Sequence, residues 1–190
     1  MIARTIQHFF LVAALLFCGA VRGSDLHVGD TIPVSVVDVD QNRLSTADGH
    51  ATVVTVVTRE DENKARELGD RVPDEYLGNP KFRMITVVNL RGKSFGPLRT
   101  LTAALIRRRL DNEARRLQRI YSTKHLKRDA RQDLFAVADF DGQIASRFGV
   151  PTSSDAFVAL VFNGNGRLIR RWNELPSAEE IAAGLAEAAD

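Results

Sequence analysis

Cysteine is almost absent from this sequence, because Cys18 is the single one among 190 residues. It lies in an apolar segment near the N-terminus that we interpret below as a removable signal peptide. Without that segment the chain would have no thiol and no disulfide. This excludes redox or nucleophilic chemistry on cysteines of the mature chain. Its folded state must then be held by a hydrophobic core, which a chain of this size can form.

Metal and phosphate motifs are also missing. Three of the histidines are scattered without the spacing of metal ligands: His27, His50 and His125. Asp139-Phe140-Asp141-Gly142 begins like a calcium loop, but the later ligands and the distant glutamate are absent, so we expect a plain turn. No glycine-rich phosphate loop occurs, and no serine stands in a nucleophile elbow. We therefore expect no cofactor and no bound metal.

The first 23 residues have the pattern of a secretory signal peptide. Arg4 provides the positive start, Phe9–Phe17 forms a nine-residue apolar core, and small residues follow at Cys18–Ala20 and Val21–Gly23. The core is too short for a membrane span, which needs roughly 20 apolar residues. An uncleaved anchor and a lipoprotein signal at Cys18 are the alternatives, although Phe17 is larger than lipidation favours. We expect a periplasmic or secreted protein.

Residues 24–190 should then form one domain. Apolar residues make up 44% of the sequence, as in globular proteins, and the net charge is only +2. We find no internal repeat and no low-complexity tract.

Hydrophobic periodicity predicts an alternation of strands and helices. The β-branched run Thr52–Thr58 predicts a buried strand. Between Leu98 and Tyr121 the pattern is helical, with Pro97 at its start and a change of phase near Arg107–Arg109 that suggests two helices or a bend. The other predicted elements are a hairpin at Val34–Val39 and Leu44, a helix at about 60–72, a strand at Arg83–Leu90, a strand and short helix from Leu134, a hairpin at Phe157–Phe162 and Arg167–Trp172, and a helix at Ser177–Ala189.

This order of elements predicts an α/β fold. Successive strand–helix–strand units imply a parallel central sheet, and the C-terminal hairpin adds an antiparallel pair. Two capping boxes are expected: Thr58 with Asp61, and Ser177 with Glu180.

Three segments in order resemble the peroxiredoxin and redoxin branch of the thioredoxin-like superfamily. They are HVGDTIPVSVVDVDQNRLS from His27, FAVADFDGQIASRFGVP from Phe135 and FVALVFNGNGRLIRRW from Phe157. The resemblance covers essentially Leu26–Ala189. It implies a thioredoxin-like fold, with a mixed central sheet flanked by helices.

The redox residues of that family are not matched. The family's catalytic cysteine follows the strand equivalent to Thr52–Thr58, but here Thr58-Arg59-Glu60-Asp61-Glu62 occupies that position. Its cis-proline precedes the last hairpin, where this chain has Ser154-Asp155-Ala156. No catalytic residue can therefore be carried over. The resemblance only marks the position of the redox site, at Thr58, Glu60, Asp61, Glu62 and Asp155.

The acidic residues at this position have two interpretations. Carboxylates at a helix N-terminus are ordinary partners of the helix dipole. Alternatively, Glu60, Asp61 and Glu62 could form a general acid–base or cation site where the family has its thiol.

Positive charge is concentrated between residues 99 and 131. This segment contains eleven lysines and arginines and three acidic residues, so its net charge is +8. Because the whole chain has a net charge of +2, the remaining residues carry −6. We interpret residues 98–131 as a basic helical insertion. An acidic protein, an acidic polymer or an anionic membrane surface could contact Arg107, Arg108, Arg115, Arg116 and Arg119, with Arg109 beside them. Export argues against nucleic acid, and a merely solvated helix face is the alternative.

Two function classes follow. The favoured one is an exported, non-catalytic binding or accessory module of the cell envelope. The other is a divergent redoxin-type enzyme that acts through the thiols of a partner or through the Glu60, Asp61 and Glu62 carboxylates.

Overall fold

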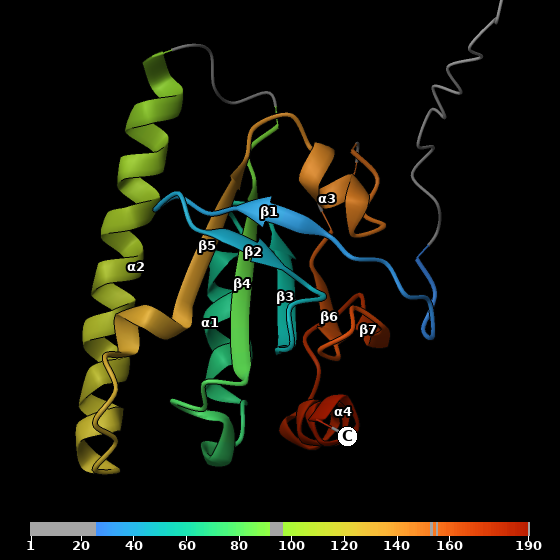
Figure 1. Ribbon diagram of the computed structural model, residues 1–190. Helices are drawn as coiled ribbons and strands as arrows, with labels where there is room; N and C mark the ends of the chain where they lie inside the picture. Colours follow the sequence, from blue (N-terminus) through green and yellow to red (C-terminus); the bar gives the residue numbers. More distant parts are fainter. Residues whose placement is uncertain (1–25, 92–96, 153, 155, 190) are drawn as a thin grey trace, which may run out of the picture.

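The fold is that of a computed structural model, which describes residues 26–91, 97–152, 154 and 156–189 (Figure 1). The predicted signal peptide therefore lies outside the described residues. The central sheet has the order β5-β4-β3-β6-β7. Its strands are β3 (Ala51–Val57), β4 (Phe82–Asn89), β5 (Leu134–Asp139), β6 (Val158–Phe162) and β7 (Leu168–Trp172).

The sheet is mixed, as predicted. Strand β3 pairs in parallel with β4, and β4 pairs in parallel with β5. On the other side, β3–β6 and β6–β7 are antiparallel pairs. Val54 at the centre lies opposite Ile85 on one neighbour and Leu160 on the other. The α/β prediction is confirmed.

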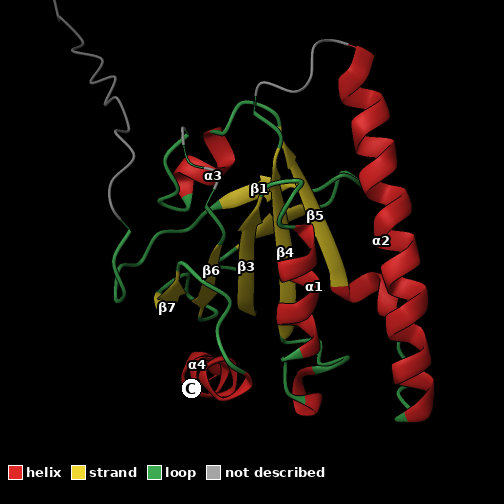
Figure 2. Ribbon diagram, turned by 180° about the vertical axis from the view of Figure 1, so that it is seen from behind, coloured by secondary structure: helices red, strands yellow, loops and turns green. Residues whose placement is uncertain are grey.

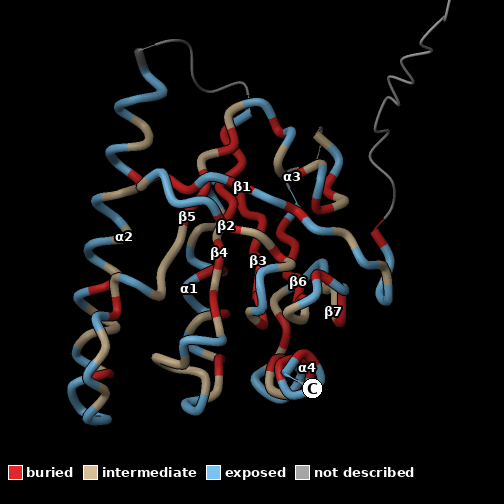
Figure 3. The backbone as a smooth tube through the Cα atoms, viewed as in Figure 1, coloured by how far each residue is buried: buried red, intermediate tan, exposed pale blue. Residues whose placement is uncertain are grey.

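Two hydrophobic layers hold the sheet, because every residue of β3 is buried. One layer includes Val53 and Val57 together with Leu68 of helix α1 (Glu62–Asp70) and Ile181 of helix α4 (Ala178–Ala189). The other layer contains Val54 and residues of the small hairpin β1 (Ser35–Val37) and β2 (Arg43–Ser45) and of helix α3 (Gln143–Arg147). Figure 3 shows the buried residues concentrated in the strands.

Helix α2 (Pro97–Thr123) is one continuous helix of 27 residues, so the predicted break near Arg107–Arg109 is wrong. Figure 2 shows it running past the β5 edge, with α1 beside it on the same face of the sheet. The change of phase in the sequence reflects a change in how the apolar side chains of the helix are exposed. Leu98, Leu101 and Leu105 are exposed, whereas Ile106 and Ala114 are buried on the side toward the domain.

One predicted capping box forms and the other does not. The Ser177 backbone N–H donates to Glu180 Oε2 at 2.7 Å, and the Glu180 N–H donates to Ser177 Oγ at 3.2 Å. Helix α1 begins only at Glu62, after an N-cap residue, Asp61, whose side chain accepts no capping hydrogen bond. The Thr58 hydroxyl instead donates to Asp61 Oδ2 at 3.4 Å. The Thr58 box is therefore wrong because the helix starts later than its pattern implies.

Among the described helices, including the two short 3-10 segments η1 (Asp74–Tyr76) and η2 (Ala130–Asp133), we find none with both the length and the apolar character of a membrane span.

Candidate functional site

The position at which the resembled family carries its redox site is the junction between β3 and α1. Thr58 is 5% exposed there, and its carbonyl oxygen accepts from the Asp61 N–H at 3.2 Å. Glu60 is exposed at the surface of the turn. Asp155 lies outside the described residues.

The two carboxylates at the start of α1 bind different cations. Asp61 Oδ1 lies 2.7 Å from Lys64 Nζ on the same helix. Glu62 is paired with Arg109, which reaches over from α2. Each is thus engaged in a surface ion pair, and the two do not share a proton or a common ligand position.

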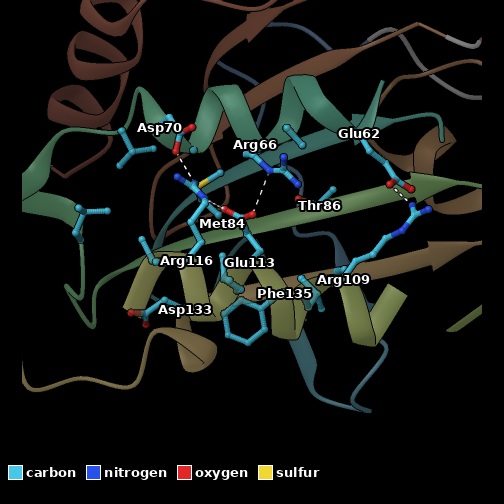
Figure 4. Close-up of a pocket in the computed structure, with 18 of the residues that line it drawn as sticks. Glu62, Arg66, Asp70, Met84, Thr86, Arg109, Glu113, Arg116, Asp133 and Phe135 are labelled. Carbon is cyan, nitrogen blue, oxygen red and sulfur yellow. Dashed lines mark hydrogen bonds and ion pairs between the residues drawn. The ribbon is translucent and has the colours of Figure 1, made fainter. Parts of the chain in front are cut away.

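A cavity begins at the end of this junction, where Glu62 is one of its lining residues. This cavity of about 360 Å³ lies between α1, α2, β4 and β5 and is open to solvent on one side (Figure 4). Met84, Thr86 and Val88 come from β4, where alternate residues point to the same face of the sheet. Ile106 and Leu110 form the opposite wall on α2. Its volume falls within the roughly 300–1,000 Å³ typical of small-molecule sites.

Ion pairs between α1 and α2 cross the mouth of this cavity, as Figure 4 shows. Glu113 Oε2 lies 3.1 Å from Arg66 Nε, and Glu113 Oε1 lies 2.6 Å from Arg116 Nε. Arg116 Nη2 also lies 2.5 Å from Asp70 Oδ1. Partial burial alone would lower the pKa of Arg116, but the hydrogen bonds with Asp70 and Glu113 raise it above its ordinary value. We call Arg66, Glu113, Arg116 and Asp70 the ion-pair chain.

A partly buried polar network lies at the far end of the cavity. The Tyr121 hydroxyl donates to Asp133 Oδ2 at 2.8 Å and accepts from the Gly78 N–H at 2.8 Å. Arg128 Nε bonds the other oxygen of Asp133 at 2.6 Å. Burial, followed by the hydrogen bond to Asp133, raises the pKa of Tyr121 well above its usual range. The Tyr121 hydroxyl and both carboxylate oxygens of Asp133 are thus hydrogen-bonded.

The six arginines between residues 107 and 119 of α2 fall into two groups. Arg107, Arg109 and Arg116 bind acids of the domain, with Arg107 Nε 2.9 Å from Asp40 Oδ1. The other three expected contact residues are exposed: Arg108, Arg115 and Arg119. Of these, Arg115 bonds the Asn112 side chain and Arg119 Nη1 bonds the Arg115 carbonyl at 3.3 Å, so both stay on the helix surface.

The segment that resembles a calcium loop forms a turn and a helix start. Asp139 Oδ1 accepts from the Gly142 N–H at 3.0 Å, and Oδ2 accepts from the Ala145 N–H at 2.7 Å. Burial of Asp139 raises the pKa of its carboxyl. Over the described part of the chain, no three His, Cys, Asp or Glu side chains gather in a way that could hold a metal ion.

Sequence reasoning missed the cavity. Its signal was present on α2, where Ile106, Leu110 and Leu117 recur on one face with Arg109 and Arg116 beside them. That pattern does not reveal what lies opposite the helix, because the facing side chains of α1, β4 and β5 are distant in sequence.

Comparison with known proteins supports the fold. No protein-family model matches the sequence, and neither does any curated protein. Among solved structures, a thiol:disulfide interchange protein of the thioredoxin family from Chlorobium tepidum is similar, with 13% identity, 88% of this chain and 100% of that chain covered and a TM-score of 0.51. A peroxiredoxin-like protein from Aquifex aeolicus shares 14% identity over 86% of this chain and 88% of that chain, with a TM-score of 0.51.

A third similar structure is Etrx1, the pneumococcal exposed lipoprotein thioredoxin of Streptococcus pneumoniae. It shares 15% identity over 82% of this chain and 99% of that chain, with a TM-score of 0.50. At these identities the similarity shows the fold. The chain therefore has the thioredoxin-like fold that its sequence resemblance implies, but with a single cysteine and no catalytic pair.

Proposed function

We propose that the mature chain is an exported binding module of the cell envelope that uses a thioredoxin-like scaffold without thiol chemistry. The observation that carries this proposal is the junction after β3, where Thr58 to Glu62 contain no cysteine. The signal-like pattern of residues 1–23 supports export, and the structurally similar Etrx1 is itself described as an exposed lipoprotein.

An enzymatic role through the carboxylates has weaker support. A general acid–base site needs a carboxyl group that is available to a substrate. Asp61 bonds Lys64 and Glu62 bonds Arg109, so both are engaged in ion pairs. Redox activity through the thiols of a partner remains the alternative function.

A thiol–disulfide assay on residues 24–190 separates the two functions. We expect no insulin reduction with dithiothreitol and no thiol-dependent peroxide consumption above a heat-inactivated sample, because the chain offers no thiolate. The partner-thiol alternative is tested by adding a small dithiol substrate of increasing concentration. Turnover that saturates with this dithiol and disappears on heating would overturn the proposal.

A second candidate function is peripheral binding to an anionic membrane surface. One face of α2 carries Leu98, Leu101 and Leu105 at exposures of 51%, 57% and 48%. The same face continues at steps of three and four residues to Arg108, Arg115 and Arg119, which are also exposed. Exposed leucines next to arginines match a lipid surface, which accepts apolar side chains below its charged headgroups.

Vesicle binding tests this candidate. We expect the protein to sediment with phosphatidylglycerol vesicles at low salt but not with phosphatidylcholine vesicles, and to be released as salt shortens the screening length to about 8 Å at 0.15 M. A triple change of Arg108, Arg115 and Arg119 to Gln should abolish binding. The matched control makes the same charge change elsewhere, at Arg43, Lys81 and Arg167, which are exposed outside α2.

Two results would contradict the membrane candidate. Equal losses in the two triple variants would mean that net charge alone matters. Binding to polyglutamate or another acidic polymer without binding to vesicles would point to an acidic partner instead.

A further inference from the structure

We propose that the cavity between α1, α2 and the sheet binds one alkyl chain of a neutral lipid-like molecule. This inference rests on the proposed function, since it assigns a ligand class to the binding module. One end of the cavity is lined by Glu62, the last residue of the junction where related folds carry their thiol.

The shape of the cavity argues for a slender ligand. Its lining along α2 extends from Ile106 to Tyr121, which corresponds to about 22 Å of helix. A lining of this length accommodates a linear hydrocarbon chain that lies along α2.

Most of the lining surface is apolar and supplies dispersion contacts, while the charged side chains of the lining form the ion pairs described above. Met84, Leu110, Leu117 and Phe135 present apolar groups from three different elements. Thr86 Oγ1 accepts a hydrogen bond from Thr55 Oγ1 at 3.2 Å, so this hydroxyl is engaged within the sheet. An apolar chain placed here leaves water without stranding a buried polar group.

The charges at the mouth argue for a neutral ligand. Three arginines and three acids meet there, and they pair with one another: Arg66, Arg109 and Arg116 with Glu62, Asp70 and Glu113. The rim therefore offers no net charge. A ligand carboxylate would have to displace Glu113, which bonds both Arg66 and Arg116.

The same ion pairs form the entrance. The ion-pair chain and the Glu62–Arg109 pair join α1 to α2 across the opening, so they border the path by which an alkyl chain enters. Ion pairs at this level of exposure are weak and are screened by salt. We expect salt to speed association of the alkyl chain, whereas binding of an anion to free arginines would be weakened by salt.

Displacement of a fluorescent probe tests the ligand class. The neutral, rod-shaped probe 1,6-diphenyl-1,3,5-hexatriene is bound to residues 24–190 and displaced with linear primary alcohols of increasing length. Each added methylene should tighten binding by about fourfold until the alkyl chain fills the cavity, after which affinity levels off. Decanoate should compete more weakly than decan-1-ol.

Cavity-filling variants locate the site. Leu110→Phe and Leu117→Phe enlarge side chains that line the cavity, and each should reduce alcohol affinity by about tenfold or more. Val37→Phe on β1 is the matched control, because Val37 is 48% exposed and does not line the cavity. Circular dichroism and urea unfolding show whether each variant is folded, and the two cavity variants provide independent tests.

The outcomes separate this inference from the proposed function. No probe binding by the folded wild type, binding unaffected by both cavity variants, or tighter binding of decanoate than of decan-1-ol would overturn the neutral alkyl ligand. The proposed function is overturned by a different result, which is thiol turnover in the thiol–disulfide assay. The two failures can therefore be told apart.

Discussion

Replacing Asp48 with Asn should destabilise the fold through a buried arginine. Arg83 of β4 is 5% exposed, and its guanidinium binds Asp48 at two points, Nη1–Oδ2 at 3.0 Å and Nη2–Oδ1 at 2.8 Å. Arg83 Nη2 also donates to the Ser45 carbonyl at 2.6 Å. The substitution retains the shape of the side chain and removes the charge that neutralises Arg83.

The magnitude follows from the burial of the two partners. Removing one member of a fully buried ion pair costs about 3–5 kcal/mol, because the other charge is left uncompensated. The Asp48 side chain is 33% exposed, so water screens part of this interaction, and we expect a loss of about 2–3 kcal/mol in the free energy of unfolding. Asp111→Asn is the control, since the Asp111 side chain is 54% exposed beside Arg131. This substitution should lower the free energy of unfolding by less than about 1 kcal/mol.

The effect should also depend on pH. Although burial acts to raise it, hydrogen bonds from Arg83 and His50 lower the pKa of Asp48 below its ordinary 3.8. The stabilisation is therefore complete above pH 3.8 and is lost as pH falls through the lowered value. Asp48→Asn should remove this part of the acid sensitivity.

Urea unfolding followed by circular dichroism at pH 7 and pH 3 measures both quantities. Arg83→Met combined with Asp48→Asn should recover part of the loss, because the buried charge is then removed as well. Equal, small losses for Asp48→Asn and Asp111→Asn would refute the assignment of Arg83 as a buried charge that depends on Asp48.

Three further predictions concern other elements. Ser177→Ala should cost about 1 kcal/mol of unfolding free energy in urea titrations, because the Glu180 N–H loses its cap, whereas Thr58→Ser should leave the start of α1 unchanged in amide exchange. Gly69→Ala should stabilise the protein in thermal unfolding by about 0.5 kcal/mol, since an added Cβ meets only the Met84 side chain, at 3.6 Å, and alanine favours the helix. Because the pKa of Tyr121 is raised, its stabilising effect should be complete below pH 10 and be lost as pH rises further, and Tyr121→Phe should remove this alkaline dependence in urea titrations.

The sequence was sufficient for elements whose causes are local. Thr52–Thr58 is β-branched throughout, and a strand appears at Ala51–Val57. Ser177 and Glu180 are three residues apart, and the box they form needs no distant partner. The hairpin turn at Asn163–Gly166 is equally local, with the Gly166 N–H donating to the Asn163 carbonyl at 3.0 Å.

The sequence alone does not predict features that depend on contacts between residues far apart in the chain. The phase change within α2 suggested a bend, but it reflects a helix whose first turns face solvent at Leu101 and whose later turns face the domain at Ala114. The charge pattern places Arg109 and Arg116 on a basic surface. In the structure both bind acidic residues of α1 that are more than forty positions away in the sequence. The cavity depends on four elements at once, so no single segment indicates it.

The central claim is that the exported chain carries no thiol, and one intact-mass measurement tests it most directly. Protein recovered from the native envelope or medium is denatured, treated with iodoacetamide and weighed by mass spectrometry. We predict a chain that begins after about residue 20–23, the usual signal length, with no added alkyl group. A mass that includes Met1, or a chain alkylated at Cys18, would contradict the claim.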